Sequence, residues 1–367
     1  MEPDWPVCAS GGGCIGIRVG SNDAYLEHLD EEQRTAFLEQ LHPGADIDLC
    51  GTRLSEDLMK RLLAAVTSDS GNPRFGHARF DGARFEGDAS FQEAQFTRGA
   101  NYDKAHFGGE AWFSAARFGG QAMFPGTRFH GPASFGAARF DAEALFLGAQ
   151  FSSNSTSRRS RWRDGTSFFD HGAFFTEARF CGDAAFDRAQ FSGPAGFDHA
   201  EFEAEAQFNG AQFGPLASFV QARFSGPEWI GPLCAAGEVV LDKAAFHKAI
   251  QIEIAAAALT MVQTTFRAGA TIRVRYAAIT MDRATLAQPG ILAAAPPLAL
   301  QPSTPAGLFT SQSDEQPGAS LSLDETALEA CKLNPRPRAV SLRGVDVANL
   351  VMIDLAFAAR GGNRSNT

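Results

Sequence analysis

The sequence is short of the features that mark secreted, membrane and nucleic-acid-binding proteins. Its 6 cysteines are scattered over 367 residues, so we expect no disulfide framework. The first residues have neither a basic start nor an apolar core, and no apolar run of about 20 residues follows, which predicts a cytoplasmic protein without a secretory signal or membrane span. The net charge is −10 and no region is strongly basic, which argues against direct nucleic-acid binding.

Residues with a recognisable chemical pattern are also scarce. Residues 11–16 match G-x-G-x-x-G, but no apolar strand precedes them and no helix clearly follows, so a dinucleotide cofactor is not expected. Cys8, Cys14 and His28 are the local candidates for a metal site. Their spacing is wider than in zinc sites and Cys50 is a distant fourth ligand, so buried thiols beside an exposed histidine are the alternative.

Catalytic chemistry is not indicated anywhere else in the sequence. Histidine and carboxylate residues are scattered, and no acid, base and nucleophile form a recognisable cluster. We therefore predict that the protein is not an enzyme, with no cofactor and no assigned catalytic, cofactor-binding or metal-binding residue.

Phenylalanine is what the chain has in excess. It holds 32 Phe against 3 Tyr and 4 Trp, together with 37 Gly. Most globular proteins draw their apolar side chains mainly from Leu, Ile and Val. A chain that uses one aromatic residue so heavily repeats a single structural position many times.

After Phe85 the aromatic residues recur at alternating steps of six and five residues, and an alanine stands two residues before almost every one. Such a repeat is sought first because its period determines the fold. The aromatic positions are Phe75, Phe80, Phe85, Phe91, Phe96, Tyr102, Phe107, Phe113, Phe118, Phe124, Phe129, Phe135, Phe140, Phe146 and Phe151, and then Phe169, Phe175, Phe180, Phe186, Phe191, Phe197, Phe202, Phe208, Phe213, Phe219 and Phe224.

This spacing predicts short strands and excludes a helix. On a helix, a five-residue step would turn successive rings to nearly opposite sides, and the glycines between them would each cost about 1 kcal/mol. In a strand, alanine and the phenylalanine two residues later point inward together, and the residues that follow form a corner. Four such sides, alternately of five and six residues, close one coil, which places Phe113 over Phe91 and Phe135 over Phe113.

These units resemble the pentapeptide-repeat family. Residues 78–82 (ARFDG) and 138–142 (ARFDA) carry the family pattern, and the resemblance covers at least residues 75–224. It implies an all-β fold, a right-handed quadrilateral β-helix. The sixth residue in alternate units departs from the strict five, which resembles the Phe-rich bacterial branch of the family.

The rest of the chain divides around this solenoid. Residues 1–72 hold 13 acidic and 5 basic residues and are predicted to form an acidic helical N-terminal cap. Its amphipathic helices are expected over residues 31–41 and 55–66, with a first strand around Ile47 between them. Residues 73–286 form the β-helix, irregular after 230 and interrupted by a bulged basic loop at 152–168, which is either a solvated loop or a partner contact.

The C-terminal part changes composition. Residues 287–338 are rich in proline and are predicted to be a loop or a disordered excursion, with one short helix over residues 324–332. Residues 339–358 restore a residual repeat coil and 359–367 form a polar tail. We see no C-terminal cap, so this end is truncated, dimerises, is capped by a partner, or frays.

The functional expectation is a non-enzymatic scaffold that binds a protein partner. The family resemblance implies one alternative, a DNA-mimicking protein that interacts with a topoisomerase such as DNA gyrase, often as a homodimer. Residues 73–230 carry a net charge of only −3, which is little for a DNA mimic. Another alternative is a regulatory module that docks a signalling or membrane partner through its acidic cap.

Overall fold

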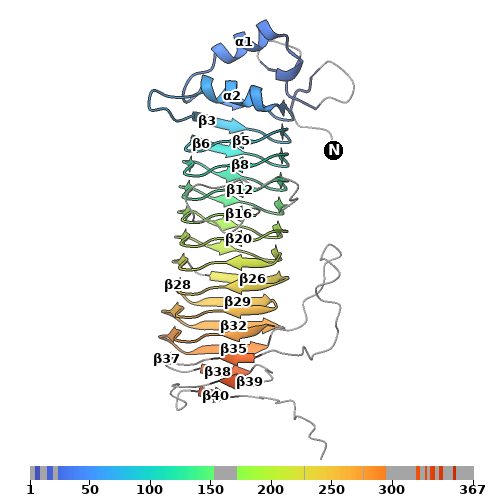
Figure 1. The fold of residues 1–367 in the computed structure, drawn as a ribbon. Helices are drawn as coiled ribbons and strands as arrows, with labels where there is room; N and C mark the ends of the chain where they lie inside the picture. The colour runs from blue at the N-terminus through green and yellow to red at the C-terminus, as the bar shows by residue number, and fades with distance from the viewer. Residues whose placement is uncertain are drawn as a thin grey trace, which may run out of the picture.

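The chain folds into a parallel β-solenoid whose N-terminal end is covered by two helices (Figure 1). This confirms the all-β quadrilateral β-helix with a small helical cap. The structure is a computed structural model, and it describes residues 5–8, 15–19, 24–152, 172–226, 228–275 and 277–294 and the strands within 320–322, 327–328, 331–334, 339–341 and 350–352.

Each regular coil has four sides, which we call faces A, B, C and D in chain order. One coil shows them in turn: β9 (Arg117–Phe118) on face A, β10 (Ala122–Met123) on face B, β11 (Arg128–Phe129) on face C and β12 (Ala133–Ser134) on face D. Every strand pairs in parallel with the same side of the coils before and after it. The predicted period of four sides per coil is therefore confirmed, as in the pairing of Phe129 with Phe107 and Phe151.

The strands of each face share one column. On face A the others are β13 (Arg139–Phe140), β17 (Arg179–Phe180), β21 (Glu201–Phe202), β25 (Arg223–Phe224), β28 (Ala245–Phe246), β31 (Thr265–Phe266), β34 (Thr285–Leu286) and β37 (Ala327–Leu328). On face B they are β1 (Ile47–Asp48), β14 (Ala144–Leu145), β18 (Ala184–Ala185) and β22 (Ala206–Gln207), and on face C they are β2 (Arg53–Leu54), β4 (Arg84–Phe85), β7 (His106–Phe107), β15 (Gln150–Phe151), β19 (Gln190–Phe191) and β23 (Gln212–Phe213).

Face D is a separate sheet, and a few longer strands run over two faces. The other strands of face D are β5 (Ala89–Ser90), β8 (Ala111–Trp112), β16 (Ala173–Phe174), β20 (Ala195–Gly196), β24 (Leu216–Ser218), β27 (Glu238–Val240), β30 (Ala258–Thr260), β33 (Ala278–Thr280), β36 (Ser320–Ser322) and β39 (Ala339–Ser341). The longer strands and their C-terminal continuations are β3 (Arg74–Arg79), β6 (Gln95–Asn101), β26 (Glu228–Ala235), β29 (Ile250–Ala255), β32 (Ala270–Arg275), β35 (Gly290–Ala294), β38 (Cys331–Asn334) and β40 (Leu350–Met352).

The interior is filled by stacked phenylalanine rings. Phe113 lies parallel to Phe135 of the next coil, with ring centroids 4.8 Å apart, and meets Phe124 of the neighbouring face edge-on at 5.5 Å. All three rings are fully buried. Burying one such side chain contributes about 1.5–3 kcal/mol, and each favourable ring pair adds about 0.5–1.5 kcal/mol. The inward alanines, such as Ala116, leave the space that the rings occupy.

The five-residue corners depend on a left-handed backbone conformation. The residue two positions after the inward ring has a positive φ, as at Gly126 (60°) between faces B and C and at Ala137 (54°) between faces D and A. Glycine adopts this region without strain, whereas alanine adopts it at a cost. The six-residue steps connect the remaining pairs of faces, which explains why the two step lengths must alternate.

A second, shorter period begins near residue 246. Phe246 pairs with Phe266, and Thr265 pairs with Thr285, so each coil here is two residues shorter than the coils before it. We expected irregular coils after residue 230. The register does shift between Ile230 and Leu233, but the coils after Phe246 pair as regularly as those before. Faces B and C are joined in one continuous strand, β29, and the corner between them is gone.

The helical cap lies over the first coil (Figure 1). It contains α1 (Glu31–Glu39) and α2 (Glu56–Ala65), preceded by the short 3-10 helix η1 (Leu26–His28). The Asp30 side chain accepts the backbone N–H of Gln33, and the Ser55 side chain accepts that of Leu58, so both helices begin at capping residues. The predicted helices and the strand at Ile47, which pairs with β3, are confirmed.

The coil next to the predicted loop differs from expectation. Phe135 stacks on Phe175 of the next coil. The two residues are separated by many more residues in the sequence than other stacked pairs, such as Phe113 and Phe135. Phe175 therefore occupies the face D side that follows Phe151. The predicted bulged basic loop at 152–168 falls, apart from Ser152, outside the described residues.

The C-terminal predictions need two corrections. The short helix expected over residues 324–332 is wrong, because β37 and β38 pair in parallel with β34 and β35. The proline-rich segment 287–338 is also not a loop throughout, since β35 to β38 continue the solenoid inside it. The expected residual coil at 339–358 contains β39 and β40, which pair with β36 and β38.

Candidate interaction surfaces

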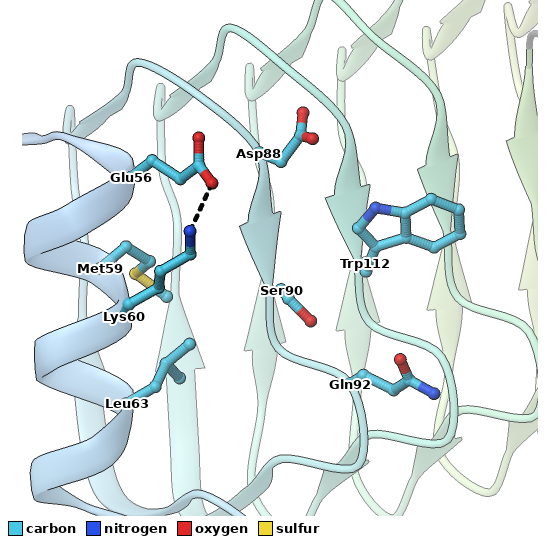
Figure 2. Close-up of a pocket in the computed structure, with 8 residues that line it drawn as sticks. All are labelled: Glu56, Met59, Lys60, Leu63, Asp88, Ser90, Gln92 and Trp112. Carbon is cyan, nitrogen blue, oxygen red and sulfur yellow. Dashed lines mark hydrogen bonds and ion pairs between the residues drawn. The ribbon is translucent and has the colours of Figure 1, made fainter. Parts of the chain in front are cut away.

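A groove of about 360 Å³ lies between the cap and face D. Figure 2 shows α2 on one side of it and the outer surface of β5 and β8 on the other, with Trp112 on the strand beyond Ser90. Its lining combines apolar and charged side chains: Glu56, Met59, Lys60, Leu63, Asp88, Ser90, Gln92 and Trp112. Residue spacing alone does not reveal this groove, because it depends on the position of α2 against face D. The one signal in the sequence is Trp112, an unusual residue at an outward repeat position.

The charges in this groove are mostly engaged. Lys60 Nζ lies 2.7 Å from the Glu56 carboxylate, and the dashed line in Figure 2 marks this pair. Asp88 Oδ1 accepts the backbone N–H of Glu110 at 2.8 Å. Burial, and then repulsion from Asp88, raise the pKa of the Glu110 carboxyl above its usual value. The groove can hold a small or peptide ligand, but its residues do not form a nucleophile and base pair.

A second groove, of about 520 Å³, runs along face B where the coils shorten. Trp229 and Ile291 line it and are 50% and 41% exposed, which is high for large apolar side chains. Gln251 and Thr271 lie between them in the same outward column. Apart from the Glu205 carboxylate, this groove offers contact area and hydrogen-bonding groups rather than charge.

On face A, outward arginines are neutralised by carboxylates. Asp141 lies 2.9 Å from Arg117 Nε and 2.5 Å from Arg139 Nε, so one carboxylate bridges two coils. Partial burial opposes ionisation, but the two guanidinium groups hold the pKa of Asp141 below its usual value. Further along, Arg179 pairs with Glu203, and Arg223 pairs with Glu201 at 3.2 Å.

On the opposite face C, the arginines that the structure describes stand at the same outward position but are not neutralised by carboxylates. Arg53, Arg84 and Arg128 are exposed, and within the described residues their side chains form no ion pair. His106 stands between Arg84 and Arg128 in the same column. Burial first, and then the charges of Arg128 and Arg84, lower the pKa of His106. The local potential at this face is therefore positive.

Near the cap, a cysteine and an aspartate are buried together. The Cys50 thiol donates a hydrogen bond to Asp81 Oδ2 at 3.3 Å. Burial is the main reason why the pKa of both groups is raised, and the neighbouring Asp48 and Asp81 carboxylates raise that of Cys50 further. The thiol is thus held in its protonated form, which is unsuited to nucleophilic chemistry.

The proposed metal ligands are only partly brought together. Cys8 Sγ lies 3.3 Å from His28 Nδ1, but Cys14 is outside the described residues. Cys50 bonds Asp81 instead of joining them. Within the described part of the chain no three metal-ligating side chains form a group. Residues 11–14 of the glycine-rich motif also lie outside the described residues.

Comparison with known proteins identifies one family. The family model described as pentapeptide repeats matches in 9 copies, over residues 71–117, 91–139 and 186–227. No curated protein and no solved structure matches the chain. Among the described residues, no helix has the length and apolar character needed to cross a membrane.

Proposed function

Because the chain is a pentapeptide-repeat protein, we propose that it is a non-enzymatic scaffold that binds a protein partner through the outward side chains of its solenoid. The observation that carries this proposal is the strict division of the repeat. Alanine and phenylalanine fill the interior, while arginine, glutamine and carboxylate side chains stand in columns on the faces. A rigid surface of this kind binds without an entropic cost for its own ordering.

The same division supports the absence of catalysis. The inward positions hold apolar groups, and the outward charges of face A are engaged with one another. The most enclosed thiol, Cys50, is held protonated beside Asp81. These features favour binding over reaction chemistry.

The topoisomerase alternative receives less support from the surface charge. A mimic of DNA needs a continuous acidic face, because the phosphates of DNA follow one another at short intervals. The outward positions of faces A and C instead carry Arg117, Arg139, Arg84 and Arg128. Interaction with DNA gyrase, cytoplasmic location, a homodimer and membership of the Phe-rich bacterial branch all stay predictions.

The acidic-cap alternative is also weaker than the scaffold proposal. Glu31 of α1 already contacts Arg34 at 3.1 Å and Arg61 at 2.7 Å, so part of the cap's negative charge is used internally. A docking role for the cap would require its remaining carboxylates, which are spread over several elements.

The scaffold proposal is tested with the full chain and a purified partner. The immobilised protein is incubated with lysate of its source, and each retained protein is then purified and titrated against it by calorimetry. We expect at least one saturable complex with a dissociation constant in the micromolar range or below, as for specific interfaces. The proposal fails if no retained protein binds in the purified system, or if the chain turns over a substrate.

A further inference from the structure

Faces A and C carry arginine at the same repeat position, directly before the inward aromatic residue, but in different surroundings. On face A, a carboxylate two positions after the arginine neutralises it, as Asp141 does for Arg139. On face C, His130 stands two positions after Arg128 and Gly108 stands two positions after His106, so neither supplies a carboxylate. One arginine column is thus neutral and the other is not.

The surroundings of the face C column contain few negative charges. Glu86 follows Arg84, but the structure records no ion pair between them. At the adjoining corner, Asp103 pairs with Lys104 at 2.9 Å. His130 is exposed, and its ring centroid lies 6.2 Å from that of His106.

The cap adds carboxylates only beyond one end of this column. Glu56 and Asp57 begin α2, close in sequence to Arg53, and Glu56 is paired with Lys60 at 2.7 Å. The charges of Arg84, Arg128 and His130 all act on His106 in the same direction as its burial, and each lowers its pKa. The two arginines flank His106 in one column, which places the positive charge of face C around it.

The spacing of this column fits a helix better than an extended chain. Adjacent coils are about 4.8 Å apart, so Arg84 and Arg128 are separated by about 10 Å, with His106 between them. One face of an α-helix presents side chains at intervals of about 5.4 Å, at positions i, i+4 and i+7. An extended strand presents them about 6.6 Å apart and would lose register within two coils.

We propose, building on the scaffold function, that the face C column from Arg53 to Arg128 docks an acidic helical segment of a partner protein. Its carboxylates lie along the solenoid axis and contact Arg84 and Arg128, since guanidinium groups bind carboxylates through paired hydrogen bonds. The net charge of −10 opposes a long polyanion such as nucleic acid.

A labelled peptide tests this assignment by fluorescence anisotropy with the full chain. The peptide is an alanine-rich helix of about 20 residues, long enough to be helical, with glutamates at i, i+4, i+7 and i+11. A second peptide of the same composition spreads its glutamates around the helix. We expect the striped peptide to bind at least about fivefold more tightly than the dispersed one, and more weakly at high salt.

Two double variants separate the faces. Arg84→Gln with Arg128→Gln removes two charges from face C, and we expect it to weaken binding of the striped peptide about tenfold or more. Arg117→Gln with Arg139→Gln removes the same charge from face A and is expected to change binding less than about twofold. Circular dichroism checks that both variants keep the fold, which exposed arginines should not disturb.

Several outcomes overturn the proposal. Equal losses from both variants, or equal binding of both peptides, reduce it to general charge attraction. Tighter binding of an oligonucleotide of matched charge assigns the surface to phosphate. A wild-type dimer that Arg84→Gln with Arg128→Gln abolishes, measured by light scattering, makes a second copy the occupant. If the purified partner of the scaffold test still binds this variant with full affinity, only the assignment of face C fails and the scaffold function stands.

Discussion

The solenoid is built in two ways, and the difference lies in one corner. In most of the longer coils, which precede Phe246, faces B and C are separate strands joined by a left-handed corner residue such as Gly126. The last of them contains β26, which already runs over both faces. In the shorter coils that follow, β29 and β32 run through both faces without that corner. The two regions nevertheless continue the same columns on faces A and D.

The core composition changes together with the corner. Four rings fill each coil as far as Phe219, as Phe113, Phe118, Phe124 and Phe129 do, whereas the last of the longer coils keeps only the ring of Phe224. In the shorter coils the ring remains on face A, at Phe246 and Phe266, while the joined strand buries branched residues such as Ile252 and Ile254.

The physical reason is the width of the coil. Removing the corner shortens one turn of the chain by two residues, which encloses less space. Isoleucine and valine suit a continuous strand and need less room than a ring. The loss of rings and the loss of the corner are thus parts of the same change.

The largest effect is expected from deleting a ring in the four-ring coils. Phe135 stacks on Phe113 and Phe175 and meets Phe124 and Phe146 edge-on at 5.4 and 5.3 Å. Phe135→Ala should lower the free energy of unfolding by about 3–5 kcal/mol, because a cavity replaces a buried ring. Urea unfolding followed by circular dichroism measures this loss.

The matched variant in the shorter coils is Phe266→Ala. Phe266 stacks on Phe246 at 5.1 Å, and the next residue in its column is Leu286. It makes fewer ring pairs, so its loss should be smaller than that of Phe135→Ala by about 1–2 kcal/mol. Equal losses would show that the ring pairs between faces add nothing to burial.

A smaller, opposite effect is expected where a hydroxyl interrupts the rings. Tyr102 lies between Phe80 and Phe124 in one column, and its ring is fully buried. Its hydroxyl has no hydrogen-bond partner in the described part of the chain. Tyr102→Phe should therefore raise the free energy of unfolding by about 1–3 kcal/mol, again measured in urea.

The reverse change at the neighbouring ring is the control. Phe124→Tyr introduces the same hydroxyl one coil further on, where the ring is also fully buried. It should lower stability by a similar amount, about 1–3 kcal/mol. A neutral result for both variants would mean that water or a rearranged neighbour satisfies the hydroxyl.

The regular coils could be predicted from the sequence because a single residue type marks the phase. The alternation of steps between Phe91 and Phe151 assigns every inward position, and a one-residue slip would turn the whole set outward. The start of α2 was equally readable, because Ser55 accepts the backbone N–H of Leu58 as a capping residue does.

The shorter coils were missed for the same reason. Ile252 and Ile254 stand two residues apart on one strand, so they look irregular against steps of five and six. Ala327, Leu328 and Cys331 have a spacing that also suits a helix, whereas β37 and β38 place them in the solenoid. The absence of ion pairs at the described face C arginines depends on contacts between coils, and residue spacing alone cannot predict these contacts.

A smaller effect is expected from a substitution at the left-handed corner between faces B and C, which, among the described coils, only the longer ones have. Gly148 has a φ of 61°, and an added Cβ would meet no atom within 4 Å, so Gly148→Ala changes only the backbone preference. We expect a loss of about 1–2 kcal/mol. Glu253→Ala, on the joined strand that replaces this corner, should change stability by less than about 0.5 kcal/mol. Equal effects would contradict the role assigned to the left-handed corner.

The smallest effect concerns two thiols, Cys234 at the junction of the two regions and Cys181 on the regular coils. Burial raises the pKa of the Cys234 thiol on β26 to about 11, and burial raises that of Cys181 on the regular coils as well. Because the thiolate is the reactive form, a raised pKa slows alkylation at neutral pH, and the Cys234 rate should rise tenfold per pH unit until the pH approaches 11. The guanidinium groups of Arg139 and Arg179 oppose the rise in the pKa of Cys181, so peptide mapping after iodoacetamide treatment should show it modified first. Faster labelling of Cys234 would mean that the joined strands at the junction open more readily than the four-sided coils do.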